Sequence, residues 1–172
     1  MYSKQRRIFE KIISGGQTGA DQGALDAALA VNHPCGGWCP EGRKSEAGRI
    51  PDKYPVTEHA SSSYPDRTEA NVVDSDGTLI FTYGTPSAGT LLTVELAIRH
   101  EKPFCVFDLD EDPLDMEPEF IWLWGQDSDV YVLNVAGPRE SDKPGTQVLV
   151  KTVMLRLLEH AGKCYSVIEG KK

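Results

Sequence analysis

A chain of 172 residues with 40% hydrophobic and 26% charged residues has the length and composition of one ordinary soluble domain. The formal net charge of −8 at pH 7 argues against a general nucleic-acid or membrane-surface binder. No apolar run is long enough to span a bilayer, and the charged N-terminus lacks the apolar segment of a secretory signal. We therefore expect a cytoplasmic protein with reduced cysteines.

The first two predicted elements enclose a glycine-rich turn. Ile8–Ser14 is apolar and predicts a strand, Asp21–Val31 predicts a helix, and Ser14–Asp21 (SGGQTGAD) joins them. Glycines without Cβ atoms let a ligand approach the backbone, and the first N–H groups of a helix have no intrahelical partner. A phosphate or carboxylate would satisfy those groups. The stretch is neither G-x-G-x-x-G nor a Walker A loop, so a plain strand-to-helix turn is the alternative.

A polar loop, Pro40–Tyr54, follows a short glycine-containing segment, Pro34–Cys39, that is a candidate second strand. Three basic side chains of the loop could close over an anion. Arg49, between Gly48 and Ile50-Pro51, is expected to be the most fixed of them, whereas Arg43 and Lys44 fit a solvated surface loop at least as well.

A metal site is not expected in this region. His33, Cys35 and Cys39 lie close in sequence, but the C-x-x-x-C spacing has no matching second pair, and zinc sites usually need four donors.

Apolar segments and helical patterns alternate through the rest of the chain. The predicted helices are Ser63–Asp74, Leu91–Glu101, a helix containing Phe120–Trp124, and Gly145–His160. In the last of these we expect five apolar residues to lie mainly in the core: Val148, Val150, Val153, Leu155 and Leu158. The predicted strands are Thr78–Tyr83, Pro103–Asp108 and Val130–Val135. The segment Asp110–Glu119 is acidic and proline-bearing, and the tail Gly162–Lys172 is expected to add an edge strand at Tyr165–Ile168 or to stay loose.

This alternation predicts an α/β protein: a mostly parallel sheet with helices on both faces, in three layers and one domain over residues 1–172, with its core at about 8–160. Right-handed crossovers place all strand-to-helix loops at the carboxyl end of such a sheet, where ligands bind. Three glycine-bearing loops, Ser14–Gly19, Gly84–Thr90 and Ala136–Ser141, are of this type, so we expect them to converge.

The converging loops define the candidate ligand-binding residues. Arg139 could hold a phosphate or carboxylate bidentately, and its alternative is a weak surface ion pair with Glu140 or Asp142. The full candidate set is Gly15, Gly16, Gln17, Thr18, Gly19, Asp21, Arg49, Gly84, Ser87, Gly89, Thr90, Gly137 and Arg139.

Two carboxylates are candidate catalytic groups. Asp21, in the first helical turn, could bond a ligand hydroxyl or amide, or merely complement the helix dipole. Glu95, one to two turns into its helix, could reach the crevice or pair with Arg99 four residues on.

Five separated motifs, in order, resemble the family of putative molybdenum-cofactor carriers over most of Ile13–Leu158. They are Ser14–Asp21; Gly36–Pro40 with Gly42-Arg43; Ile50-Pro51 with Tyr54-Pro55; Gly89-Thr90 with Thr93–Ala97; and Asn134–Arg139. That family is similar to a branch of the Rossmann-like superfamily that also contains the lysine-decarboxylase-like (Lonely Guy) phosphoribohydrolases. The resemblance implies a Rossmann-like fold and a pocket for a phosphorylated ligand: the molybdenum cofactor in the carriers, a nucleoside monophosphate in the hydrolases.

The catalytic motif of the hydrolase branch, Pro-Gly-Gly-x-Gly-Thr-x-x-Glu, is altered here. Thr93 occupies the glutamate's place, and Glu95 lies two positions further on, about 200° around the helix. A binding or carrier protein for a phosphorylated small molecule is therefore favoured, with the molybdenum cofactor as cargo and no tightly bound metal. The alternatives are a nucleotide-processing hydrolase (N-glycosidase or phosphohydrolase) using Asp21 or Glu95, and a scaffold whose loops are only turns. Trp122 and Trp124 suggest core packing or the contact of a homo-oligomer.

Overall fold

The computed structural model describes residues 6–111 and 118–169. Its main sheet has five strands in the order β2-β1-β9-β7-β8, and every neighbouring pair is parallel. The strands are β1 (Lys11–Ile13), β2 (Cys35–Gly36), β7 (Gly77–Thr82), β8 (Phe104–Asp108) and β9 (Val132–Ala136). The predicted parallel α/β architecture is thus confirmed.

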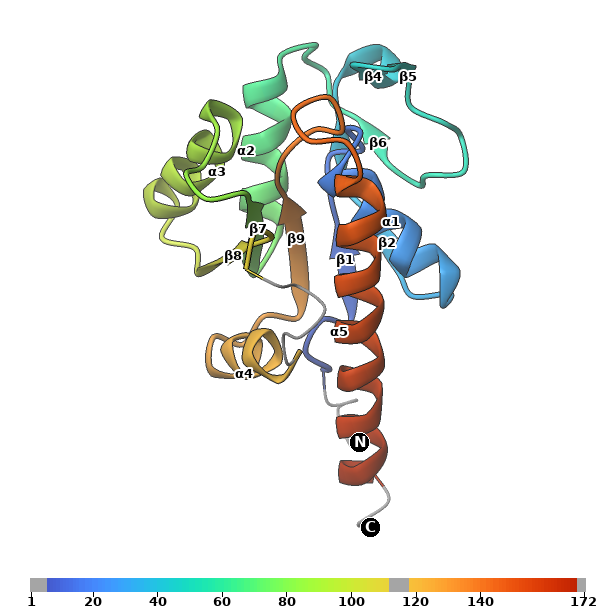
Figure 1. Cartoon of the computed structure of the whole chain (residues 1–172), viewed down its shortest axis with the longest axis vertical. Coiled ribbons are helices and arrows are strands. Elements are labelled where there is room, and N and C mark those ends of the chain that lie inside the picture. The colour runs from blue at the N-terminus through green and yellow to red at the C-terminus, as the bar shows by residue number, and fades with distance from the viewer. Residues whose placement is uncertain (1–5, 112–117, 170–172) are drawn as a thin grey trace.

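Helices cover both faces of this sheet (Figure 1). They are α1 (Ala20–Ala30), α2 (Tyr64–Asp74), α3 (Ala88–Arg99), α4 (Glu119–Asp127) and α5 (Thr146–Glu169). A large core unites α1, α4 and α5 with one side of the sheet, and a smaller one joins α2 and α3 to the other. Alternation along β8 shows the two sides, because Cys105 and Phe107 enter the large core while Phe104 packs on the small one.

Short pairings build the region between β2 and α2. Gly37, with φ of 124°, divides the expected second strand into β2 and β3 (Trp38–Cys39), and β3 pairs in parallel with β6 (Thr57–Glu58). The predicted polar loop contains a 3₁₀ turn (Glu41–Arg43) and a small hairpin of β4 (Lys44–Ser45) and β5 (Gly48–Arg49). We refer to residues 44–49 as the 44–49 hairpin.

Two predicted boundaries and one packing assignment were wrong. The first strand begins at Lys11 rather than Ile8, because Phe9 adopts a positive φ of 57°. The tail is helical as far as Glu169 instead of forming an edge strand, since Tyr165 packs on the large core and its hydroxyl accepts the N–H of Ile8. Val148, predicted to be mainly core, is 70% exposed.

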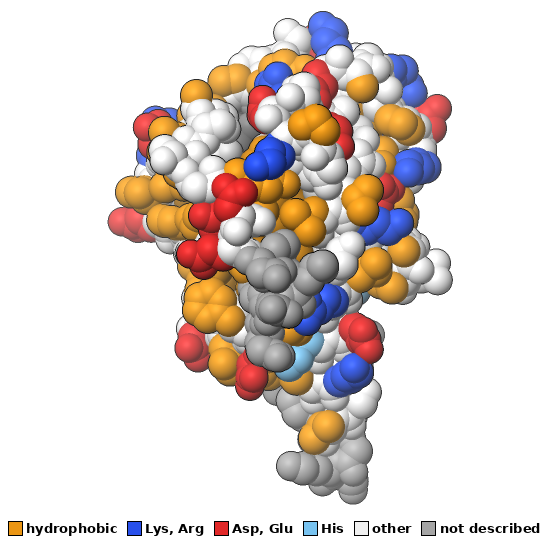
Figure 2. All heavy atoms as spheres, in the orientation of Figure 1, with side chains coloured by type: hydrophobic (Ala, Val, Ile, Leu, Met, Phe, Trp, Pro, Cys, Tyr) orange, Lys and Arg blue, Asp and Glu red, His pale blue; other side chains and the backbone are white. Residues whose placement is uncertain are grey.

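None of the described helices combines the length and apolarity needed to cross a membrane. Figure 2 shows acidic and basic side chains interspersed on the viewed face, without a continuous basic patch. Most of the acidic segment Asp110–Glu119 lies outside the described residues.

Candidate functional site

A small cleft of about 100 Å³ lies where β9 ends and α1, α2 and α3 begin. All three glycine-bearing loops reach it: Gln17 comes from the first, Gly89 from the second, and Gly137 and Arg139 from the third. The predicted convergence at the carboxyl end of the sheet is therefore confirmed. The remaining residues that line the cleft are Asp21, Tyr64, Arg67, Thr68, Leu92, Thr93 and Ala136.

The amino end of α1 is closed by protein rather than open to a ligand. Gly19 has a φ of 80°, and a Cβ atom there would lie 2.4 Å from the carbonyl oxygen of Pro138. The same oxygen accepts the N–H of Ala20 at 3.0 Å. The third loop thus occupies the position at the amino end of α1 where the sequence predicted an anion. The cleft lies beside this end of α1 and not on the helix axis.

A buried ion pair forms one wall of the cleft. Arg67 of α2 donates from Nη1 to Asp21 Oδ2 at 3.1 Å, and the two side chains are 13% and 6% exposed. Asp21 Oδ2 also accepts the N–H of Gln17 at 3.1 Å. Burial raises the pKa of the Asp21 carboxyl, although the Arg67 guanidinium and the Gln17 N–H act against that rise. Gly15 makes the pair possible, because a Cβ atom there would overlap Arg67 Nη1 at 1.5 Å.

The Gln17 side chain, 5% exposed, has one occupied and one unoccupied end. Its Oε1 accepts the N–H groups of Thr18 at 3.0 Å and Glu46 at 2.9 Å. These two donors fix which end of the amide is the oxygen. Its Nε2 is buried without a hydrogen-bond partner, and so is Nε of Arg67. Two donors on the walls of one cleft are therefore left without an acceptor.

Arg139 and Arg67 both lie over the ring of Tyr64. Their Cζ atoms are 5.3 Å and 5.8 Å from the ring centroid, within the range of cation–π interactions. Arg139 is exposed, and its backbone N–H, not its guanidinium, bonds Asp142. Among the described residues its side chain makes no ion pair within 4 Å. The predicted alternative of an ion pair with Glu140 or Asp142 was wrong.

Several predicted site residues lie outside the cleft. Gly84 turns toward the end of β8, where its N–H donates to Asp108 at 3.0 Å, and the hydroxyls of Ser87 and Thr90 face each other at 3.1 Å. Glu95 is exposed and does not line the cleft, so the crevice brings together only one of the two candidate carboxylates. Its proposed partner Arg99 approaches Glu69 instead, at 3.9 Å.

The basic side chains of the polar loop behave differently from the prediction. Arg49 is exposed, pairs with Asp52 at 2.6 Å and is not among the residues that line the cleft. Arg43 is the fixed one: its guanidinium is buried and donates to four backbone carbonyls. They belong to Ile50, Pro51, Tyr54 and Val56, at 2.9–3.2 Å. The residue of this loop that reaches the site is acidic, Glu46.

Sequence reasoning missed Tyr64 and Arg67. A signal was present, because the helix that precedes Thr78–Tyr83 must begin at the same edge of the sheet as the other helices that follow crossovers. Its first turn therefore points to the carboxyl end. The prediction rested on glycine-bearing strand-to-helix loops, and the residues directly before this helix, His59–Ser63, contain no glycine.

Metal-ligating side chains do not gather anywhere in the described ranges: no group of three His, Cys, Asp or Glu residues could hold an ion there. Cys39 is buried against Leu25, Ile50 and Tyr54, and burial raises the pKa of its thiol. His33 contacts the carbonyl of Phe9 through Nε2 at 2.7 Å.

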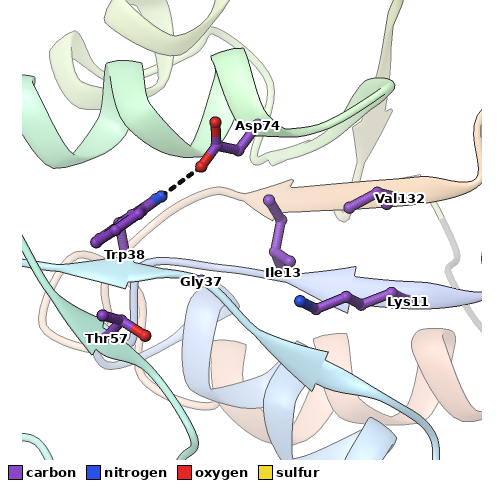
Figure 3. A pocket seen from close by; sticks show the side chains of 7 residues that line it. All are labelled: Lys11, Ile13, Gly37, Trp38, Thr57, Asp74 and Val132. Atoms are coloured by element: carbon purple, nitrogen blue, oxygen red, sulfur yellow. Dashed lines mark hydrogen bonds between the residues drawn. The ribbon is translucent and has the colours of Figure 1, made fainter.

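A second hollow of about 310 Å³ lies on the α2 side of the sheet, between β1 and α2 (Figure 3). Trp38 forms one wall and donates from Nε1 to Asp74 at 2.6 Å. Thr57, which pairs with Trp38 in the register of β3 and β6, lies beside it, and Lys11 projects from β1. Its polar side chains are exposed and its Trp38 donor is satisfied. It lacks the unpartnered buried donors that distinguish the smaller cleft.

Comparisons with known proteins agree with this architecture. The model of the circularly permutated YpsA SLOG family matches residues 12–158. A crystal structure of a protein named "Putative molybdenum carrier protein", from Syntrophus aciditrophicus SB, is 41% identical and superposes with a TM-score of 0.84. That similarity covers 90% of this chain and 98% of the other. None of the curated proteins compared with the chain matches it. The chain belongs to the circularly permutated YpsA SLOG family, with the α/β Rossmann-like fold expected from its sequence.

Proposed function

We propose that this protein binds a phosphorylated small molecule, the molybdenum cofactor or a nucleotide-like compound, and acts as its carrier. The observation that carries the proposal is the pair of orphaned donors, Gln17 Nε2 and Arg67 Nε, on the walls of one cleft. A buried donor without an acceptor costs about 1–3 kcal/mol, so a fold retains two of them at one place only with a compensating role. An oxoanion supplies acceptors to both.

The size and charge of the cleft favour recognition of one anionic group. Its volume is about 100 Å³, roughly three times the ~30 Å³ that a water molecule occupies in the liquid. Arg67 is neutralised by Asp21, whereas Arg139 at the rim contributes a positive charge and a planar donor set. A phosphate group fits inside, and the heterocycle of the ligand extends outward past Tyr64 and Arg139.

The name of the 41% identical relative supports the carrier role and the molybdenum cofactor as cargo. The hydrolase alternative now depends on Asp21 alone, because Thr93 and not a glutamate lines the cleft at the position where hydrolases carry their catalytic residue. Asp21 favours that alternative only through its raised pKa. Its Oδ2 is already occupied by Arg67 and Gln17, which fits a residue that organises donors better than one that exchanges protons with a substrate.

Titration calorimetry with pyrophosphate, nucleoside monophosphates and molybdopterin tests the proposal. We expect one of them to bind and to raise the melting temperature. Arg139→Met should weaken binding at least tenfold, since a charge-assisted hydrogen bond contributes about 1.5–3 kcal/mol. Arg67→Lys should also weaken it, because it keeps a charge beside Asp21 but removes Nε. Arg49→Met, which alters an exposed arginine outside the cleft, is the matched control.

A turnover assay on the same compounds distinguishes the carrier hypothesis from the hydrolase hypothesis. Ligand recovered intact after prolonged incubation supports the carrier. Release of free base or phosphate that Asp21→Asn abolishes would support the hydrolase. Absence of binding by every phosphorylated compound would refute the proposal.

A further inference from the structure

The tip of the 44–49 hairpin contacts two of the loops that form the cleft. The Glu46 carboxylate accepts the hydroxyls of Thr18 and Ser141 and the N–H of Ser141, the last at 3.1 Å. The Glu46 N–H donates to Gln17 Oε1 at 2.9 Å. One residue of the hairpin therefore bonds both the first and the third glycine-bearing loops.

The rest of the hairpin makes little contact with the body of the protein. Lys44, Ala47, Gly48 and Arg49 are exposed, and within the described ranges the hydrogen bonds from residues 44–49 to the first and third loops all belong to Glu46. Its base, by contrast, is fixed by the four carbonyl contacts of Arg43. Because its base is anchored and its tip is held by one residue, the 44–49 hairpin can undock as a unit from the first and third loops.

The hydrogen bond from the Glu46 N–H to Gln17 Oε1 determines whether the Gln17 side chain offers the ligand a donor or an acceptor. With Oε1 engaged by Thr18 and Glu46, the amide keeps its Nε2 as an unpartnered donor in the wall of the cleft, and this donor selects an acceptor such as an oxoanion. Loss of the Glu46 contact removes one of the two donors that hold this orientation. The amide can then rotate and place its oxygen toward the ligand, which repels an anion.

The contact between Glu46 and Ser141 holds the third glycine-bearing loop, which carries Arg139. Ser141 lies two residues after Arg139 in the third loop, and the N–H of Glu140 approaches Thr18 Oγ1 at 3.4 Å. Slight desolvation raises the pKa of the exposed Glu46 carboxyl, but hydrogen bonds from Ser141 and Thr18 outweigh it and lower the pKa, so the carboxylate is ionised at neutral pH. Glu46 thus joins the loop that carries Gln17 to the loop that carries Arg139.

We propose that Glu46 is the positioning residue of the cleft, and that docking of the 44–49 hairpin through Glu46 switches the site between an anion-binding and a weakly binding state. The inference rests on the proposed function and adds its regulation. It assigns the control of affinity to a residue that does not itself touch the ligand.

The test compares Glu46→Ala with Glu41→Ala, which removes an exposed carboxylate from the 3₁₀ turn just before the hairpin. Titration calorimetry with inorganic pyrophosphate measures affinity, and hydrogen-exchange mass spectrometry follows peptides covering residues 14–20 and 136–143. We expect Glu46→Ala to weaken pyrophosphate binding at least tenfold and to speed exchange in both peptides. Glu46→Gln, which keeps an oxygen acceptor at the tip, should fall between the two, and Glu41→Ala should match the wild type.

Unchanged affinity in Glu46→Ala, or exchange that rises across the whole chain instead of in the two loops, would overturn the inference. If the wild type does not bind pyrophosphate, the proposed function fails for this probe, and the exchange experiment still decides the hairpin. Faster exchange confined to the two loops supports docking through Glu46, and unchanged exchange refutes it.

Discussion

Two polar clusters in this protein differ in whether their buried donors have partners. Around Arg43, at the base of the 44–49 hairpin, four backbone carbonyls accept the guanidinium. In the cleft, Gln17 and Arg67 each retain a buried nitrogen without an acceptor. The first cluster is complete within the chain and therefore serves the fold, whereas the second is incomplete, which supports the proposed binding of an anionic ligand.

Buried side-chain nitrogens and oxygens without a hydrogen-bond partner are few in the described part of the chain. Only three buried side-chain nitrogens or oxygens in the described part of the chain have no partner, and two of them lie on the walls of the cleft. The third, Nε1 of Trp122, lies in the large core next to α5. Unpartnered donors, more than cavity size, thus distinguish this cleft from the larger hollow beside Trp38.

Removal of Arg43 should have the largest effect on stability. Arg43→Met leaves four carbonyls without their donor, and each buried unsatisfied group costs about 1–3 kcal/mol, so we expect a loss of about 3 kcal/mol or more in the free energy of unfolding. Urea denaturation followed by far-ultraviolet circular dichroism measures it. Arg49→Met is the control and should change stability by less than about 0.5 kcal/mol, because its ion pair is exposed. Equal urea midpoints for the two variants would show that the Arg43 cluster is not structural.

A smaller effect is expected from the pH dependence of Glu46. Its folded-state pKa is lowered, so its contribution to stability is present above the unfolded pKa of about 4.3 and is lost as pH falls through the folded value. The difference in stability between the wild type and Glu46→Gln should therefore be largest near pH 7 and shrink below about pH 4. We expect it to stay under about 1 kcal/mol, since the carboxylate is exposed.

Asp21, whose raised pKa has the opposite sign, is shared by both proteins and cancels in that comparison. Urea titrations at pH 3.5, 5 and 7 provide the measurement. A difference that does not vary with pH would mean that the ionised carboxylate is not what holds the hairpin.

The sequence predicted the architecture well because strands and helices of this fold leave local patterns. The apolar run Thr78–Tyr83 and the helix after it correspond to β7 and α3 within a few residues. Glycine-bearing loops at strand ends were sufficient to predict that Gln17, Gly89 and Arg139 meet at one edge of the sheet.

The partners of these residues could not be predicted, because they depend on contacts between distant parts of the chain. Arg67 reaches Asp21 across 46 positions, and Glu46 bonds Ser141 across 95. Arg43 and Arg49 each follow a glycine in the sequence, yet only Arg43 finds four carbonyls within reach. The folding of the loop Pro40–Tyr54 determines which of these two arginines becomes buried.

A crystal structure of the protein grown with pyrophosphate or sulfate tests the central claim most directly. Our account predicts an anion in the cleft with oxygens within about 3.2 Å of both Gln17 Nε2 and Arg67 Nε, and with Arg139 turned toward it. An anion bound elsewhere, or one that contacts Arg139 while both buried nitrogens stay without an acceptor, would contradict it.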